Sequence, residues 1–269
     1  MELHEKLDFL KEYLRGLESV VVAFSGGVDS TFLLRAAYEV LGDKCVAGTV
    51  MSHLVPKSEL EGASAFCASL GVRHEVLPAG EGYIKSFEHN PKNRCYLCKS
   101  ATFERLRALA DEIGFGNVAE GSNVDDLGDY RPGLKAVEEL GIKSPLREAG
   151  LTKAEIRALS KEYALPTWNK PAMACLASRF VYGETISPER LAMVERAEAF
   201  LFGLGLTQLR VRIHGAMARI EALPDEFGTV MRNREAINAE FAKIGYLYTT
   251  LDLRGYRTGS MNDTIKKGD

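Results

Sequence analysis

The chain of 269 residues carries a formal net charge of −3, and 46% of its residues are hydrophobic and 26% charged. This ordinary globular composition argues against a large nucleic-acid surface, and no apolar run is long enough to cross a bilayer. The amphipathic start, without the apolar block of a signal peptide, leads us to expect a cytoplasmic protein. Five cysteines in such a chain favour thiol or metal chemistry over a disulfide framework.

The first half of the chain alternates between helical and strand patterns. The predicted strands lie at 20–24, 45–51, 72–77 and 117–120, and the predicted helices at 3–17, 31–37, 57–70 and 101–113. This alternation predicts an α/β fold, with a parallel sheet, right-handed crossovers and helices on both faces. Ligands of such sheets bind at the carboxyl ends of the strands.

The second half begins with a helix over 152–163, which Thr152 and Glu155 start as a capping box. An irregular, proline-flanked stretch follows at 166–179. Beyond it the predicted elements are a helix from Ser187-Pro188, strands at 208–214 and 216–222, a helix at 233–244 and a strand at 246–251. That order is typical of a small α+β domain. We therefore predict one domain over 1–183 and a second over 184–269.

A glycine-rich turn, Ser25-Gly26-Gly27-Val28-Asp29-Ser30, joins the first strand to the next helix. Two glycines let the backbone turn sharply and approach a ligand, and a helix N-terminus favours an anion. The turn lacks the Gly-Lys-Ser/Thr ending of the P-loop. It is therefore interpreted as a phosphate cradle of another kind, although a bare Ser-Gly-Gly turn also occurs as a simple connection.

Two other predicted strands end at the same edge of the sheet. Met51 ends the second strand, and Gly121-Ser122-Asn123 follows the fourth. Asp125 and Asp126 come next, and carboxylates of this kind suit a nucleotide or a magnesium ion. A polar turn without a ligand is the competing interpretation.

The five cysteines fall into two groups. Cys45 begins an apolar strand and Cys67 lies among apolar residues of a helix, so both are expected in the core. The other three are Cys95 and Cys98, just ahead of a predicted helix, and Cys175 in the irregular stretch. The pair Cys95-Tyr96-Leu97-Cys98 can bring two sulfurs to one metal or permit redox exchange.

A structural zinc site would need two more ligands beside Cys95 and Cys98, and His89 is a possible fourth after Cys175. The three thiolates alone are one short of the usual set for a four-iron cluster. The missing ligand would leave one iron open to an external atom, which suits sulfur delivery.

Arg210, Arg212 and His214 alternate with apolar residues, which places the three on one face of a strand. A solvated strand face explains this pattern, and so does a binding site, because paired arginines suit a phosphate or a carboxylate. Further charged residues in neighbouring segments are Arg179, Arg219 and Glu221.

With Asp29 and Ser30, the turn resembles the pyrophosphate loop of the PP-loop ATP pyrophosphatase superfamily. The motifs at 25–30, 121–123, 175–179, 210–212 and 250–261 appear in order. Together they resemble the ATP-dependent sulfur transferases that make the nickel-pincer nucleotide cofactor of lactate racemase. The likeness runs from Val20 to Met261 and implies a PP-loop domain with a smaller C-terminal domain.

The resemblance implies that ATP adenylates the carboxylates of pyridinium-3,5-biscarboxylic acid mononucleotide and that sulfur then displaces AMP. Asp29 would help to position Mg²⁺ and, with Cys175, would act in catalysis. The residues expected to bind ATP are Ser25, Gly26, Gly27, Asp29, Ser30, Thr49, Met51, Gly121, Asn123 and Asp126. The residues expected at the substrate phosphate are Ser178, Arg179, Arg210 and Arg212.

In family members with one motif cysteine, the equivalent of Cys175 gives up its own sulfur and becomes dehydroalanine. This chain adds Cys95 and Cys98 and so resembles a three-cysteine branch, for which we expect a [4Fe-4S] cluster on the three thiolates. Sacrifice of Cys175 is the alternative route, and a cluster-dependent tRNA thiolase or a non-catalytic metal-binding or sulfur-carrier protein are the alternative functions. A sulfide or cysteine-derived sulfur source and a homo-oligomer are expected.

Overall fold

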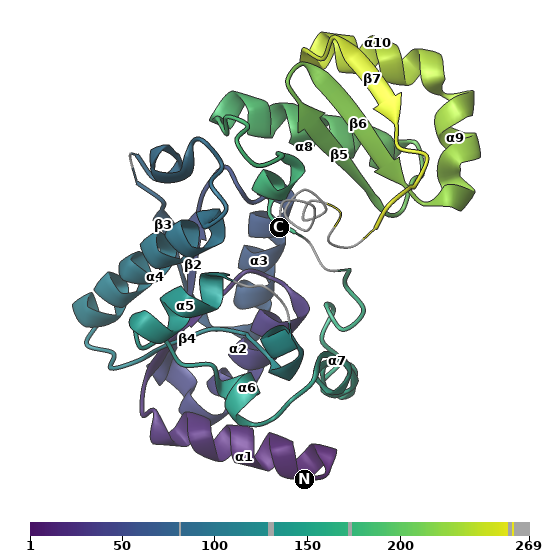
Figure 1. Cartoon of the computed structure of the whole chain (residues 1–269). Helices are drawn as coiled ribbons and strands as arrows, with labels where there is room; N and C mark the ends of the chain where they lie inside the picture. Colours follow the sequence, from purple (N-terminus) through teal and green to yellow (C-terminus); the bar gives the residue numbers. More distant parts are fainter. Residues whose placement is uncertain (81, 129–131, 172–173, 258–259, 261–269) are drawn as a thin grey trace. The chain divides into compact units, whose positions relative to one another are not determined.

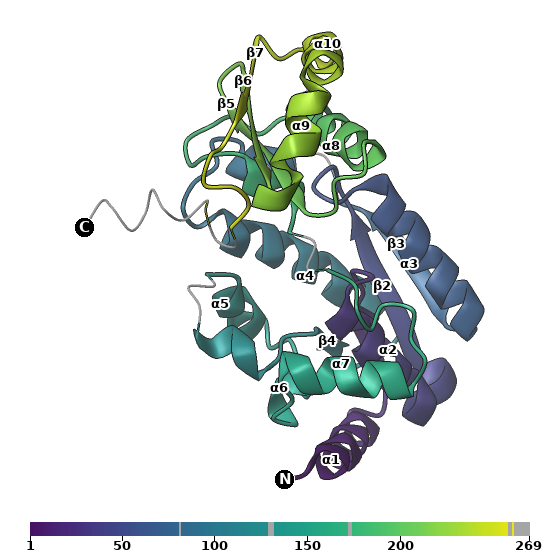
Figure 2. The ribbon, with the colours of Figure 1, turned by 90° about the vertical axis from the view of Figure 1, so that its right-hand side faces the viewer.

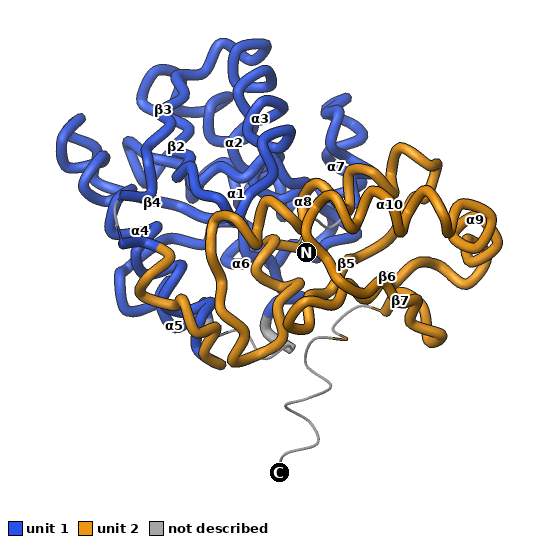
Figure 3. The backbone as a smooth tube through the Cα atoms, turned by 90° about the horizontal axis from the view of Figure 1, so that it is seen from above, with its two compact units in different colours: residues 1–83, 93–173 blue, residues 84–92, 174–269 orange. Residues whose placement is uncertain are grey.

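The computed structural model describes residues 1–80, 82–128, 132–171, 174–257 and 260. The chain forms two compact units, residues 1–83 with 93–173 and residues 84–92 with 174–269 (Figure 3). Residues 84–92 come from the middle of the first unit's sequence but belong to the second unit. Asn90 fastens them there, because its side-chain amide donates to the carbonyls of Phe180 and Val181, at 3.0 and 2.7 Å. The domain boundary at 183/184 stays a prediction.

In the first unit, four described strands form a parallel sheet in the order β3-β2-β1-β4 (Figure 1). The strands are β1 (Val20–Ala23), β2 (Cys45–Met51), β3 (Arg73–Pro78) and β4 (Val118–Ala119). The predicted α/β fold is confirmed. Because β4 lies on the opposite side of β1 from β2, the winding of the sheet reverses beside β1. Ligands of open α/β sheets bind at the carboxyl ends of strands at such a point.

The helices of the first unit cover both faces of the sheet, as predicted. They are α1 (Leu3–Gly16), α2 (Val28–Leu41), α3 (Lys57–Leu70), α4 (Arg94–Glu112), α5 (Pro132–Glu139), α6 (Pro145–Glu148) and α7 (Lys153–Glu162). Val20 and Val22 pack in a core with α1, α2, α3, α6 and α7, whereas Val21 packs in a second core with α4 and α5. Helices α4 and α5 lie side by side (Figure 2).

Two expectations about the helices of this unit need correction. Helix α4 begins at Arg94 rather than near 101, because the apolar residues of its first two turns stand in one run at 95–98 and do not recur at helical spacing. The CxxC pair therefore lies inside the helix and not ahead of it. Helices α5 and α6 were not predicted, since each is short. The capping box of α7 is confirmed, with the Glu155 carboxylate accepting from the Thr152 backbone N–H at 2.8 Å.

The second unit is a small α+β structure, as predicted. Its described elements are α8 (Pro188–Gly203), β5 (Leu209–His214), β6 (Met217–Ala222), α9 (Phe227–Arg232), α10 (Arg234–Ile244) and β7 (Tyr248–Leu251). Strand β6 pairs with β5 antiparallel and with β7 in parallel, and α8 and α10 pack on one face of this sheet (Figure 1). Within the part of the chain that the structure describes, no helix is long and apolar enough to cross a membrane.

Candidate nucleotide and substrate sites

The glycine-rich turn is closed on itself by the hydroxyl of Ser30. This hydroxyl accepts from the backbone N–H of Ser25 at 3.3 Å and donates to the carbonyl of Gly27 at 3.3 Å. The Ser25 hydroxyl lies 3.0 Å from it, and must be the donor because the single Ser30 proton is already used. Gly26 adopts a φ of +69°, which disfavours a side chain. The turn thus leaves the first N–H groups of α2 for an anion.

Gly121 brings the end of β4 against the start of α2. A Cβ atom at this position would lie 3.1 Å from the Ser30 nitrogen and 3.2 Å from the Cβ of Asp29. A side chain there would push α2 away from the strand ends. The two segments that the sequence singled out, 25–30 and 121–123, therefore meet beside β1.

Asp29 and Asn123 meet at this edge of the sheet. The Asn123 side-chain amide donates to Asp29 Oδ1 at 3.4 Å, and the backbone N–H of Asn123 donates to Asp126 Oδ2 at 3.0 Å. The Lys153 ammonium group, at the start of α7, pairs with Asp29 Oδ2. The structure thus brings together Asp29, Asn123 and Asp126, which the sequence analysis placed at the nucleotide site. Oxygen atoms of this kind suit a magnesium ion.

Two lysines beside the turn were not anticipated. Lys153 pairs with Asp29, and the Lys170 ammonium donates to the carbonyl of Gly26 at 3.1 Å and to Glu59 Oε2 at 2.6 Å. Phosphate sites commonly include a lysine, and the turn itself has none. This absence was the one feature of the sequence that could have indicated a lysine from elsewhere in the chain. The sequence does not reveal which distant lysine takes this place.

Near the end of β2, Thr49 is half-buried and Met51 is exposed. The Thr49 hydroxyl donates to the carbonyl of Phe24 at 2.7 Å, so it must accept from His74 Nε2, which lies 2.8 Å away. Burial lowers the pKa of His74 below its usual value of 6.5. Met51 is 48% exposed. A role for either residue at the adenine stays a prediction.

The cysteines divide as expected between core and accessible positions. Cys45 and Cys67 are buried, and burial raises the pKa of each thiol to about 12. Cys95 and Cys175 are exposed and Cys98 is half-buried. Among the described residues, no three His, Cys, Asp or Glu side chains gather as ligands of one metal ion.

The accessible thiols have polar neighbours. The Tyr83 hydroxyl lies 2.9 Å from the sulfur of Cys98, and the Arg94 guanidinium lies 3.9 Å from the sulfur of Cys95. Cys95 and Cys98 belong to the first unit. Cys175, in the second unit, directly precedes a short 3₁₀ helix at Leu176–Arg179.

In the second unit, the interpretation of β5 as a solvated strand face is wrong. Arg210 and Arg212 are each only 6% exposed. The Arg212 guanidinium donates to the carbonyl of Ser178 at 2.6 Å and, from Nη2, to Glu221 Oε2 at 2.9 Å. Glu221 is fully buried on β6. Buried arginines of this kind need partners, and the sequence pattern does not show them.

Arg179 and Arg210 are engaged within the protein. Two nitrogens of the Arg179 guanidinium pair with the carboxylate of Glu198, at 2.9 and 2.8 Å, and its Nη1 donates to the carbonyls of Ala174 and Cys175. Arg210 donates to the carbonyl of Leu209 and lies over the ring of Tyr256, 5.2 Å from its centroid. Burial, and then the charge of Arg179, lower the pKa of Arg210.

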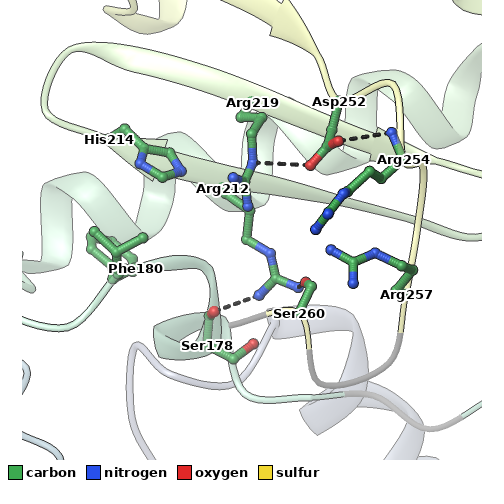
Figure 4. A pocket seen from close by; sticks show the side chains of 10 residues that line it. Ser178, Phe180, Arg212, His214, Arg219, Asp252, Arg254, Arg257 and Ser260 are labelled. Atoms are coloured by element: carbon green, nitrogen blue, oxygen red, sulfur yellow. Dashed lines mark hydrogen bonds and ion pairs between the residues drawn. The ribbon is translucent and has the colours of Figure 1, made fainter. Parts of the chain in front are cut away.

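A cavity of about 170 Å³, with several charged residues in its lining, lies beside β5 and β6 of this unit (Figure 4). Ser178 and Arg212, both predicted at the substrate phosphate, line it. Arg219, Arg254 and Arg257 line it too, and the sequence analysis did not place the last two in any site. The last motif of the sequence continues through Thr258, Gly259 and Met261, which lie outside the described residues. The cavity is cationic and suits an anionic ligand.

Comparisons with known proteins agree with this picture. The model of the NAD synthase family matches residues 2–112, which include the glycine-rich turn. The chain is 38% identical over 94% of its length to the pyridinium-3,5-bisthiocarboxylic acid mononucleotide synthase of Lactiplantibacillus plantarum, with 92% of that protein covered. It is 42% identical over 98% of its length to an uncharacterized protein of Synechocystis, which is covered completely.

A more distant relative is the glutamine-hydrolyzing GMP synthase of Aeropyrum pernix, 26% identical over 67% of this chain, with 38% of that protein covered. The parallel sheet and its glycine-rich turn define a PP-loop α/β protein that uses ATP. The chain belongs to the family of the pyridinium-3,5-bisthiocarboxylic acid mononucleotide synthases, which are ATP-dependent sulfur transferases of nickel-pincer nucleotide synthesis. The resemblance stated from the sequence motifs is confirmed.

Proposed function

We propose that this chain adenylates the carboxylates of pyridinium-3,5-biscarboxylic acid mononucleotide and converts them to thiocarboxylates. The carboxylate oxygen attacks the α-phosphorus of ATP and pyrophosphate leaves; a sulfur nucleophile then forms the C–S bond and AMP leaves. The observation that carries the proposal is the closed turn at 25–30 with Asp29, Asn123 and Lys153 around it. It supplies N–H donors, a carboxylate and a cation where a triphosphate can bind.

In this mechanism Ser25, Gly26, Gly27 and Ser30 hold the departing pyrophosphate. Asp29 would hold the Mg²⁺ that the PP-loop family uses with ATP, and the ion would neutralise phosphate charge; carboxylate oxygens such as those of Asp29 and the neighbouring Asp126 fit it. Lys153, which pairs with Asp29, is the cation that would contact a phosphate. The remaining predicted contacts to ATP are Thr49, Met51, Gly121, Asn123 and Asp126.

For the substrate we propose that Ser178 and Arg212 contact its phosphate from the cavity of the second unit, and that Arg210, two residues before Arg212 on β5, adds positive charge. Arg179 is better suited to a positioning role than to direct binding. Its guanidinium holds the carbonyls at 174 and 175 and, at 3.1 Å, the hydroxyl of Ser178. It therefore fixes the backbone that carries both Cys175 and Ser178.

For the sulfur step we propose that Cys95, Cys98 and Cys175 bind a [4Fe-4S] cluster. The donor chemistry fits, because Cys95 and Cys175 are exposed and Cys98 is half-buried, whereas the other two cysteines are buried. A cluster with one iron free of protein ligands would supply bound sulfide as the nucleophile. Anaerobic reconstitution should give about four irons per chain, and a chain without iron that still transfers sulfur would overturn this part of the proposal.

We further propose that the enzyme works in the cytoplasm as a homo-oligomer and receives sulfur from sulfide or a cysteine-derived source. The exposure of Leu247, at 76%, and Tyr248, at 67%, on and beside the edge strand β7 supports association. Native mass spectrometry measures the assembly, and a strictly monomeric protein would contradict it.

The adenylation proposal is tested by pyrophosphate release from ATP in the presence of the pyridinium mononucleotide. Asp29→Ala should abolish release and keep the fold by circular dichroism. Near-normal release from that folded variant would remove the turn from the mechanism. Release that requires tRNA in place of the mononucleotide would identify a tRNA thiolase instead.

A further inference from the structure

The peptide group between Gly26 and Gly27 lies at the centre of the glycine-rich turn. With glycine on both sides, no Cβ atom restricts this peptide group, so it can rotate at low cost. A trans peptide points its carbonyl and its N–H in opposite directions. In one orientation the group therefore offers the N–H of Gly27 to a bound anion. In the other it offers a carbonyl oxygen, which repels the anion.

The central peptide group is held from outside the turn. Inside the turn, the Ser30 hydroxyl fixes the two ends, because it accepts from the N–H of Ser25 and donates to the carbonyl of Gly27. The carbonyl of Gly26 instead accepts from the ammonium group of Lys170 at 3.1 Å, across 144 residues of sequence. This contact directs the carbonyl toward Lys170 and hence the N–H of Gly27 away from it.

Lys170 is itself fixed at both ends. Its ammonium group pairs at 2.6 Å with the carboxylate of Glu59 in the first turn of α3. Gly26 lies against the same turn, since a Cβ atom there would be 3.6 Å from the carbonyl of Glu59. The backbone of Lys170 is held by Arg157 of α7, whose guanidinium donates to the carbonyls of Trp168 and Lys170, both at 2.8 Å. The ammonium group is therefore a fixed donor beside the turn.

We propose that Lys170 is a positioning residue of the nucleotide site, which holds the Gly26–Gly27 peptide in the orientation that presents its N–H to the pyrophosphate group of ATP. Glu59 keeps the ammonium group in place for this role. The inference rests on the proposed function of the turn as the pyrophosphate-binding element. Lys170 acts through the backbone of the turn, whereas Lys153 is the lysine proposed to contact a phosphate directly.

The sequence offers a selective probe of this peptide group, because Gly26-Gly27 is its only pair of adjacent glycines. Cell-free synthesis of the full chain with carbonyl-¹³C glycine and ¹⁵N glycine labels one directly bonded ¹³C–¹⁵N pair, that of the central peptide. Magic-angle-spinning NMR with a filter for such pairs detects it at any assembly size. In the wild-type chain this signal should shift when inorganic pyrophosphate and Mg²⁺ are added.

Lys170→Ala should change the signal before any ligand is added, because the carbonyl loses its donor and the peptide group can rotate. The affinity for pyrophosphate, measured by isothermal titration calorimetry, should fall by about ten- to a hundredfold. Lys170→Arg keeps a cationic donor and should restore most of the signal and of the affinity, which guards against misfolding. Glu59→Gln should cause a smaller change in the same direction.

Lys11→Ala is the matched control. Lys11 pairs with Glu39 at 2.7 Å, and this pair joins α1 to the last turn of α2 with a partial exposure similar to that of Lys170 and Glu59. The control should keep the signal and the affinity of the wild type.

Two results would overturn the inference. If Lys170→Ala lowers the affinity and leaves the ligand-free signal unchanged, Lys170 is a direct ligand of the phosphate. If the signal changes and the affinity does not, the orientation of this peptide group does not matter for binding. Failure of the proposed function is seen separately, as an absence of pyrophosphate release from ATP and the pyridinium mononucleotide by a wild-type chain whose signal responds to pyrophosphate.

Discussion

The ammonium group of Lys153 is paired with the carboxylate of Asp29 in the glycine-rich turn, although 124 residues separate them in the chain. Helix α7 therefore supplies the lysine that the turn lacks. Both side chains remain partly exposed, at 33% for Lys153 and 24% for Asp29. A ligand can therefore reach this pair.

Lys153→Ala should lower the rate of substrate-dependent pyrophosphate release by about tenfold or more, because a charge-assisted contact to phosphate typically contributes about 1.5–3 kcal/mol. Lys161→Ala is the control, since Lys161 lies on the same helix and only approaches the ring of Trp168, at 5.1 Å. A steady-state pyrophosphate assay compares the two variants. Equal rates for Lys153→Ala and the wild type would exclude the lysine from the nucleotide site.

Gly121→Ala should raise the KM for ATP, because the added methyl group would press on Asp29 and the Ser30 nitrogen and displace the start of α2. Gly62→Ala is the control, because Gly62 lies in helix α3 and the new Cβ would have no described atom within 4 Å. Since alanine favours a helix more than glycine does, this substitution should raise the free energy of unfolding by about 1 kcal/mol. Kinetics over a range of ATP concentrations and urea unfolding measure the two effects. An unchanged KM in the Gly121 variant would show that this contact does not shape the ATP site.

Arg179→Ala should reduce the free energy of unfolding by about 3–5 kcal/mol, because it leaves the buried carboxylate of Glu198 without its partner. Replacing both residues together, with Arg179→Met and Glu198→Leu, should recover much of that loss. Urea denaturation of the single and double variants gives both values. If the single variant is as stable as the wild type and loses only substrate affinity, Arg179 is a direct phosphate ligand.

Cys95→Ala, Cys98→Ala and Cys175→Ala should each lose the reconstituted iron or its sulfur-transfer activity, whereas Cys67→Ala should keep both. The reason is accessibility, since Cys67 is fully buried in the core of the first unit. Iron analysis and intact-protein mass after turnover test this. A wild-type chain that has lost the mass of hydrogen sulfide at Cys175, in the absence of iron, would establish the sacrificial route instead.

The free energy of unfolding should fall as the pH drops below 6.5. Burial lowers the pKa of His74 and of His214 in the folded chain, so below 6.5 the unfolded chain binds more protons and is favoured. The stabilisation is therefore complete above pH 6.5 and is lost as the pH falls through the folded pKa values. Urea unfolding between pH 8 and 5 checks the slope, which should be shallower in His214→Gln. A stability that rises on acidification over this range would contradict the assignment.

The sequence by itself determined the α/β fold, the glycine-rich turn and the family. These follow from local rules: apolar periodicity sets strands and helices, and Ser25 to Ser30 must bend where a strand meets a helix. The meeting of this turn with Gly121 to Asn123 was also predictable, because carboxyl ends of parallel strands share one edge of the sheet. Burial of Cys45 and Cys67 followed from their apolar neighbours.

Tertiary structure alone decided which distant charges meet. Nothing near Asp29 in the sequence points to Lys153, and the alternation of β5 does not reveal that Glu221 neutralises Arg212 from the next strand. Pairing of buried charges depends on strand register and helix packing, which bring together residues far apart in the chain. The same holds for Arg254 and Arg257, which reach the cavity because the turn at Gly255 fastens their segment to β6.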